Sequence, residues 1–182
     1  MSLARHDAVY WRRRGLIYEQ RYLDTDDRQE QERELIRYLD GLQFSSVLDV
    51  GCGFGRIGAL LTQVRDISYT GIDLSPQMLE SARRKIPNGY FRKVSLEAFG
   101  PTHPYDLVLA VEVLMHINPT RIGEFIAKLR SLSRRHVVTV DWTEPLPDNA
   151  QDRHNWRHDY RKLLGADPVV QFGYQSLYHV GP

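Results

Sequence analysis

The residues of this chain best suited to chemistry are acids and histidines that follow short apolar runs. The first of them, Asp49, stands two residues ahead of three glycines at alternate positions, Gly51, Gly53 and Gly55. Glycine tolerates positive φ and, without a Cβ, allows a ligand to approach the backbone closely. An acid beside such a turn is typical of a binding site for a nucleotide-like ligand.

The elements that must position these glycines can be inferred from the residues on either side. The apolar run that ends at Val50 has the length of a buried strand, and an apolar spacing compatible with a helix resumes at Gly55. The segment therefore predicts a strand, a tight turn and a helix N-terminus, where free backbone N–H groups can meet a ligand.

Two patterns compete at the glycines. The stretch from Gly53 to Gly58 fits G-x-G-x-x-G, and Asp73 follows about 20 residues later, as in dinucleotide-binding dehydrogenases. The other pattern starts at Asp49 and continues through the three alternate glycines. Gly58 belongs to the ligand cradle in the first pattern, whereas in the second it only packs a helix.

The rest of the chain alternates between predicted strands and helices. A capping box at Asp27 and Glu30 starts a helix that runs to about residue 42, and Ser75-Pro76 is a good start for another. The alternation predicts an α/β fold with a doubly wound, mostly parallel seven-stranded sheet and a C-terminal antiparallel hairpin at one edge. The expected strands are 47–50, 67–73, 90–94, 105–111, 136–140, 169–172 and 176–179, and further helices are expected from 118 and over 156–164.

Composition is that of a compact globular protein. The chain has 182 residues, of which 42% are hydrophobic and 26% charged, and its net charge is +1. This charge gives no bulk electrostatic reason for binding nucleic acid or a membrane, and no apolar run approaches the roughly 18 residues that span a bilayer. The N-terminus lacks the apolar core of a signal peptide and Cys52 is the single cysteine, so we expect a cytoplasmic protein without disulfides.

Three segments, in the right order, resemble the class I S-adenosylmethionine-dependent methyltransferases. Val47–Gly55 looks like the first motif of that family, Thr70–Leu79 like its second and Tyr105–Ile117 like its fourth. The resemblance extends over roughly residues 44–141 and favours the glycine pattern that starts at Asp49. It implies a Rossmann-like methyltransferase fold with S-adenosylmethionine as the cofactor, rather than a dehydrogenase.

The resemblance also implies which residues meet the cofactor. Asp49 is expected near the methionyl end, Asp73 at the two ribose hydroxyls, which an ionised carboxylate can accept, and Glu112 on the sulfonium side. The family often has an acid at the adenine amino group, where this chain has Ser95-Leu96, so backbone or packing contacts are expected there instead. The expected cofactor-binding residues are Asp49, Gly51, Cys52, Gly53, Gly55, Asp73, Leu74, Ser95, Leu96, Val111, Glu112 and Met115.

Methyl transfer is an in-line displacement, and a poor nucleophile also benefits from a general base. His116 stands where the family often has histidine, Asp141 ends the predicted fifth strand, and His158 lies in a polar, aromatic stretch. These are the candidate catalytic residues, and each also has a structural interpretation as a capping, packing or surface residue. No metal is expected, because Trp142 follows Asp141 and the acid–amide pair of catechol-type O-methyltransferases is missing.

The expected function is methylation of an O or N atom of a small-molecule metabolite. Residues 1–28, which are aromatic and basic, are expected to form a helical lid on a single S-adenosylmethionine-binding domain of residues 29–182. No Asn/Asp-Pro-Pro-aromatic tetrapeptide follows the fourth predicted strand, which counts against methylation of the exocyclic amines of bases. Two alternatives stay open: a methyltransferase acting on RNA or protein, and a non-catalytic S-adenosylmethionine-binding or scaffold protein.

Overall fold

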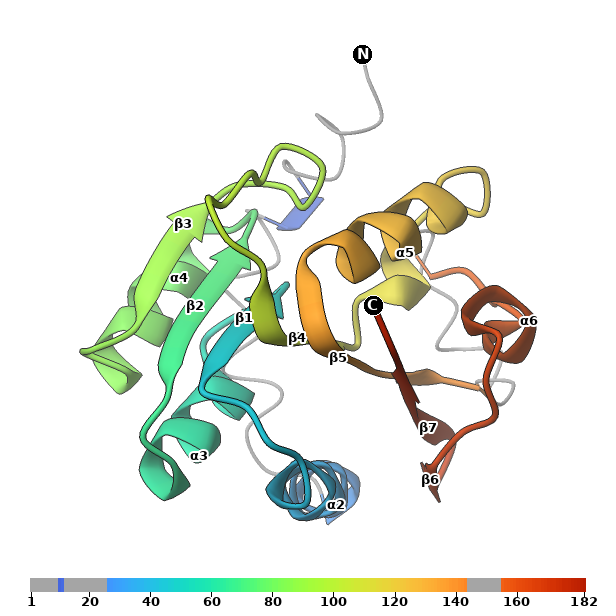
Figure 1. Cartoon of the computed structure of the whole chain (residues 1–182), viewed down its shortest axis with the longest axis horizontal. Coiled ribbons are helices and arrows are strands. Elements are labelled where there is room, and N and C mark those ends of the chain that lie inside the picture. The colour runs from blue at the N-terminus through green and yellow to red at the C-terminus, as the bar shows by residue number, and fades with distance from the viewer. Residues whose placement is uncertain (1–9, 12–25, 144–154) are drawn as a thin grey trace. The chain divides into compact units, whose positions relative to one another are not determined.

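The computed structural model (Figure 1) describes residues 10–11, 26–143 and 155–182, with the side chains of the long middle range from residue 29 onward. The chain divides into two compact units, Met1–Phe99 and Gly100–Pro182. The predicted lid lies almost wholly outside the described residues. Among the described helices, none is long and apolar enough to cross a membrane.

The first unit contains three parallel strands with two helices on one face. β1 pairs with β2 and β2 with β3, in the register Asp49↔Gly71 and Gly71↔Phe91. α3 and α4 both contact β2 and also contact each other, which places them on the same face, and α2 packs on α3. In chain order the elements are α2 (Asp26–Asp40), β1 (Ser46–Val50), α3 (Arg56–Val64), β2 (Ser68–Asp73), α4 (Pro76–Lys85) and β3 (Tyr90–Lys93).

The second unit contains four strands, of which one pair is parallel. β4 runs parallel to β5, whereas β7 pairs antiparallel with both β5 and β6. The 3-10 helix η1 and helix α5 contact β5, and α6 packs on α5. The elements are β4 (Tyr105–Val111), η1 (Leu114–His116), α5 (Ile122–Ser131), β5 (Ser133–Trp142), α6 (Tyr160–Leu164), β6 (Val170–Phe172) and β7 (Gln175–Val180).

The strand order confirms the predicted fold class. It is β3-β2-β1-β4-β5-β7-β6, a seven-stranded, mostly parallel sheet with the antiparallel hairpin β6–β7 at one edge. Parallel strands that are covered on both faces show little alternation of apolar and polar residues, and β4 is buried at every position except its two ends. The apolar run at 105–111 therefore forms a strand with the predicted bounds.

Three elements of the second unit begin at least three residues from their predicted starts. α5 begins at Ile122 rather than at residue 118, because residues 118–121 form a turn in which the Arg121 amide donates to the Asn118 carbonyl at 2.8 Å. β5 begins at Ser133 rather than at residue 136. Its first residues include the exposed Arg134 and Arg135, so they do not belong to the apolar run from which the strand was predicted. α6 begins at Tyr160 rather than near residue 156, because the Asp159 side chain caps it by accepting from the Lys162 amide at 3.1 Å. Residues 155–159 have no regular secondary structure, and the Trp156 amide donates to the Met115 carbonyl at 2.7 Å.

Candidate functional site

The glycine turn after β1 has the backbone conformation that its sequence predicts. Gly51, Gly53 and Gly55 all have positive φ, at 68°, 54° and 78°. The amides of Gly51 and Cys52 donate to the Ile72 carbonyl at 2.8 and 3.1 Å, which fixes the turn to the end of β2. A Cβ placed on Gly53 would have no atom within 4 Å, so the backbone here faces open space that a ligand can occupy.

Asp73 joins this turn to the start of α4. One carboxylate oxygen accepts from the Gly53 amide at 3.0 Å and the other from the Ser75 amide at 2.7 Å. Burial raises the pKa of Asp73, and its backbone hydrogen bonds oppose that rise. The Ser75 hydroxyl in turn caps α4 by accepting from the Met78 amide, as predicted. Asp73 thus shapes the turn, and a carboxylate with about four lone-pair sites keeps acceptor capacity beyond its backbone amides for a further donor.

Asp49 is buried immediately ahead of the turn. Its side chain is 3% exposed, and one oxygen accepts from the Tyr69 hydroxyl at 2.6 Å. Burial raises the pKa of Asp49 to about 7; the Tyr69 hydrogen bond lowers it, the Asp73 charge raises it and the Arg56 charge lowers it. Tyr69 did not stand out in the sequence, although it lies two residues before Gly71 and so on the same face of β2.

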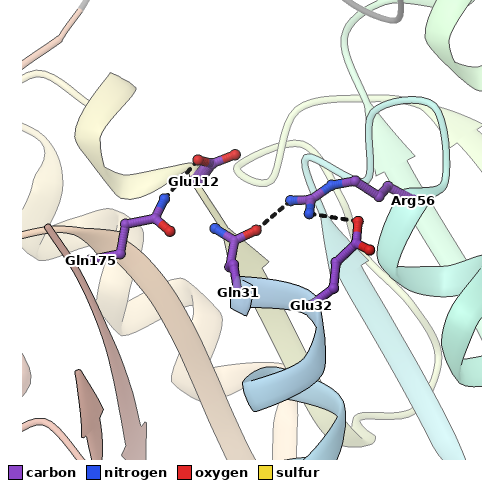
Figure 2. A network of polar contacts seen from close by, with 5 residues as sticks. All are labelled: Gln31, Glu32, Arg56, Glu112 and Gln175. Atoms are coloured by element: carbon purple, nitrogen blue, oxygen red, sulfur yellow. Dashed lines mark hydrogen bonds and ion pairs between the residues drawn. The ribbon is translucent and has the colours of Figure 1, made fainter. Parts of the chain in front are cut away.

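Arg56, the first residue of α3, connects the turn to α2 (Figure 2). Its guanidinium donates to Glu32 at 2.9 Å and to Gln31 at 2.6 Å. Gln31 is fully buried, and the Arg56 side chain is 16% exposed, so these bonds are largely shielded from water. Helix α2 therefore holds the N-terminus of α3, the end at which the glycine turn presents its amides.

Glu112, directly after β4, has a strained backbone. Its φ is 57°, which is uncommon for a residue other than glycine, and its amide donates to the Val140 carbonyl at 2.6 Å. Its carboxylate accepts from the Gln175 amide group at 2.7 Å (Figure 2). Such conformations persist only where neighbours hold them and they cluster at functional sites. The sequence did not single out Gln175, because only the fold brings the start of β7, which pairs with β5, within reach of Glu112.

Asp141, a candidate catalytic residue, is fully buried at the end of β5. One oxygen accepts from the Met115 amide at 3.1 Å, whereas the other has no hydrogen-bond partner among the described residues. Burial raises the pKa of Asp141 well above its usual value, and the nearby Glu112 charge adds to this rise. The geometry is that of a cap on η1, which is the structural alternative that the sequence left open.

The two candidate histidines are more accessible. His116 ends η1 and is partly exposed. His158 is also partly exposed; its Nε2 lies 3.0 Å from the Ile117 carbonyl, which can only accept, so Nε2 carries the proton. Burial lowers the pKa of His158. Asp141 and His158 thus both bind the segment that follows β4.

The remaining predicted cofactor residues lie at the ends of strands. Cys52 is buried against Gly71, and Leu74 is partly exposed after β2. Ser95 follows β3, where its hydroxyl accepts from the Ala98 amide at 3.4 Å, and Leu96 is buried beside it. Val111 ends β4 and is partly exposed, whereas Met115 is buried. Among the described side chains, no group of three or more His, Cys, Asp or Glu could hold a metal ion.

Substitutions at Asp141 are expected to separate its capping role from its charge. Asn keeps an oxygen for the Met115 amide and cannot ionise. The parent loses stability as pH rises from the ordinary pKa of an aspartate to the raised pKa of this acid, so the stability of D141N relative to the parent should increase from pH 5 to pH 9. Ala also removes the charge but leaves the Met115 amide unsatisfied, so D141A should be less stable than D141N by about 1–3 kcal/mol at both pH values. Equal stability of the two variants would contradict the cap.

Comparison with known proteins places the chain in a family. The family described as "Methyltransferase domain" matches residues 47–136. The trans-aconitate 2-methyltransferase of Azoarcus sp. (strain BH72) is 32% identical over 116 residues, which cover 62% of this chain and 46% of that protein. The ubiquinone biosynthesis O-methyltransferase of Rhodopseudomonas palustris (strain TIE-1) is 26% identical over 147 residues, which cover 79% of this chain and 53% of that protein. The chain spans about half the length of these curated relatives.

The fold has a solved counterpart over nearly its whole length. Magnesium protoporphyrin IX methyltransferase from Synechocystis PCC 6803, solved with bound S-adenosylmethionine, has a TM-score of 0.77 at 21% identity, covering 98% of this chain and 96% of that one. An identity this low establishes the fold alone. The family match and the relatives agree with the three motifs, so residues 47–136 form a methyltransferase domain of the class I S-adenosylmethionine-dependent type, and the solved structure confirms its fold.

Proposed function

We propose that this protein binds S-adenosylmethionine at the glycine turn and transfers its methyl group to an O or N atom of a small-molecule metabolite. The observation that carries the proposal is the open space beside the backbone of Gly53. The Gly53 amide donates to the Asp73 carboxylate, and this carboxylate can also accept from the hydroxyls of a ribose. A side chain at Gly53 would fill the space that the ligand needs, so the residues present fit the cofactor.

Within this proposal the predicted cofactor residues keep their roles. In the first unit Asp49, Asp73 and the turn hold the methionyl and ribose parts, while Ser95 and Leu96 line the adenine. In the second unit Val111, Glu112 and Met115 face the sulfonium, with Gln175 fixing the Glu112 carboxylate. The protein resides in the cytoplasm.

The sulfonium of the cofactor supplies an electrophilic methyl group. On transfer of this methyl group the sulfur would keep the electron pair, and an acceptor hydroxyl or amine would lose a proton. His116 and His158 are the accessible groups that can take this proton, while Asp141, buried on the η1 amides, positions the segment that carries His116. Alignment supplies most of the acceleration, with a base adding about 10²–10⁴-fold.

A small acceptor and an oxygen target are supported by the names of the relatives. These are trans-aconitate 2-methyltransferases and O-methyltransferases, one of them of ubiquinone biosynthesis. A macromolecular acceptor is the alternative within enzymes, and a binding protein without turnover is the alternative outside them. No oligomeric state is proposed.

The test is transfer of a labelled methyl group from S-adenosylmethionine into a cell extract. The proposal expects label in small molecules that pass an ultrafilter, absent with the Asp73→Ala variant, and mass spectrometry then identifies the acceptor. Label confined to precipitated RNA or protein would overturn the choice of acceptor. Cofactor binding without any transfer would indicate the non-catalytic alternative.

A further inference from the structure

The Tyr69 side chain on β2 contacts Asp49 on β1, and the residue of β2 that lies opposite Asp49 is Gly71, which has no side chain to block this contact. In the β1–β2 register Asp49 lies opposite Gly71, and Tyr69 precedes Gly71 by two residues. Tyr69 and Asp49 are therefore diagonal neighbours on one face, a distance that an aromatic side chain can span. Gly71 offers no side chain in between, and the Tyr69 hydroxyl lies 2.6 Å from the carboxylate.

Gly58 of α3 leaves the space that the tyrosine ring occupies. A Cβ on Gly58 would lie 2.3 Å from Cζ and 2.4 Å from the hydroxyl oxygen of Tyr69, closer than any real contact. On another side the ring of Phe91 lies 5.8 Å away between centroids. Tyr69 is 3% exposed, so its hydroxyl has a fixed position rather than a choice of rotamers. The second glycine pattern had made Gly58 a packing residue, and this contact is the packing that it permits.

Few charged or titratable groups act on the Asp49 carboxyl. Asp73 opposes its ionisation, and Arg56 favours it from a distance while bonded to Glu32 and Gln31. Cys52 is a buried thiol whose own pKa is raised, so it carries no charge at neutral pH. Tyr69 is the group that donates a hydrogen bond directly, and burial raises its pKa as well, which keeps the hydroxyl a donor.

We propose that Tyr69 is a positioning residue for cofactor recognition: its hydroxyl orients the Asp49 carboxylate and favours its charged form, so that the ammonium at the methionyl end of S-adenosylmethionine meets a charge. This inference rests on the proposed function. A hydrogen bond to a carboxylate stabilises its ionised form, so the bond couples the orientation of Asp49 to its protonation. Tyr69 thereby affects ligand binding through Asp49, without contacting the ligand itself.

The first arm of the test uses ligand-free protein. Tyr69→Phe keeps the ring in the Gly58 space and deletes only the hydroxyl, and the Asp49 pKa is measured by carbon NMR with labelled aspartate. We expect that pKa to rise by about one unit in Tyr69→Phe. The matched control, Tyr90→Phe, deletes the hydroxyl of a tyrosine that is 59% exposed in the same unit and should leave the Asp49 pKa unchanged. An unchanged Asp49 pKa in Tyr69→Phe would overturn the proposal.

The second arm measures S-adenosylmethionine affinity by calorimetry from pH 5 to pH 9. If only ionised Asp49 binds, a pKa that moves from about 7 to about 8 lowers the competent fraction at pH 7 from about one half to about one tenth. The ratio of parent to variant affinity should then be about 10 at pH 5, about 5 at pH 7 and near 1 at pH 9. The α-amino group of the ligand titrates equally against both proteins, so it cancels from this ratio.

A purely structural role would give a different profile. Loosening of the turn would cost the same factor at every pH, and that result would overturn the proposal even if affinity falls. Gly58→Ala is the second variant, because it displaces the ring while keeping the hydroxyl; it should raise the Asp49 pKa in the same direction. If the parent protein bound no S-adenosylmethionine, the proposed function would fail with the ligand part of this inference, whereas the ligand-free arm would still decide whether Tyr69 controls Asp49.

Discussion

Replacing Asp73 with alanine is expected to reduce the affinity for S-adenosylmethionine by at least about a hundredfold. Each hydrogen bond from a ribose hydroxyl to the carboxylate contributes about 1.5–3 kcal/mol, and two of them amount to roughly 3–6 kcal/mol, or 10²–10⁴ in the dissociation constant. The same carboxylate also holds the Gly53 and Ser75 amides, so its removal loosens the turn itself. Both effects act in the same direction on affinity.

The measurement is calorimetric titration of Asp73→Ala beside Asp66→Ala. Asp66 is an exposed acid in the same unit, two residues before the start of β2, and its replacement should leave affinity within about twofold. The thermal unfolding midpoint of Asp73→Ala is expected to fall by only a few degrees, since the losses are a cap and one turn bond. An affinity equal to that of the parent would refute the ribose assignment.

The stability of the ligand-free protein is expected to fall as pH rises from 4 to 8, and Asp49 is one source of this fall. The pKa of this acid is about 7 in the folded protein and about 3.9 in an unfolded chain, so the folded state binds the extra proton between these values. The contribution of Asp49 to the free energy of unfolding is therefore fully present below pH 4 and is lost as pH rises through 7. The difference corresponds to about 4 kcal/mol.

Urea unfolding at several pH values measures this slope, and Asp49→Asn isolates its source. Asparagine keeps an oxygen for the Tyr69 hydroxyl but cannot ionise, so this variant should lose the part of the slope that comes from Asp49. A residual fall remains because burial also raises the pKa values of Asp73 and Asp141. Asp66→Asn is the matched control and should keep the parent slope. A parent that gains stability over this pH range would show that Asp49 is ionised in the folded state.

The fold could be predicted from the sequence because its signals are local. The glycine turn at 51–55 needs positive φ, Ser75 caps the helix that it precedes, and the apolar run at 105–111 has no alternation, as a strand covered on both faces requires. The helix before the C-terminal hairpin was placed too early because residues 155–159 bond to the segment after β4, which lies about 40 residues away in the sequence.

The candidate site could be predicted only in part. Motif residues such as Asp49 and Asp73 can be recognised by their type and spacing, because binding a given ligand requires particular side chains at particular positions in the sequence. Tyr69 and Gln175 do not, because each matters through a partner that the strand register brings to it. The interpretation of Asp141 also needed the fold: its type suggests a base, whereas its burial and its bond to the Met115 amide indicate a cap.

The most direct measurement of the central claim is calorimetric titration of the protein with S-adenosylmethionine, with NAD titrated under the same conditions. Saturable one-to-one binding of S-adenosylmethionine and no heat from NAD is the predicted result, because the turn places Asp49 and Asp73 around Gly53 in the pattern of the methyltransferases. Binding of NAD without binding of S-adenosylmethionine would contradict the account.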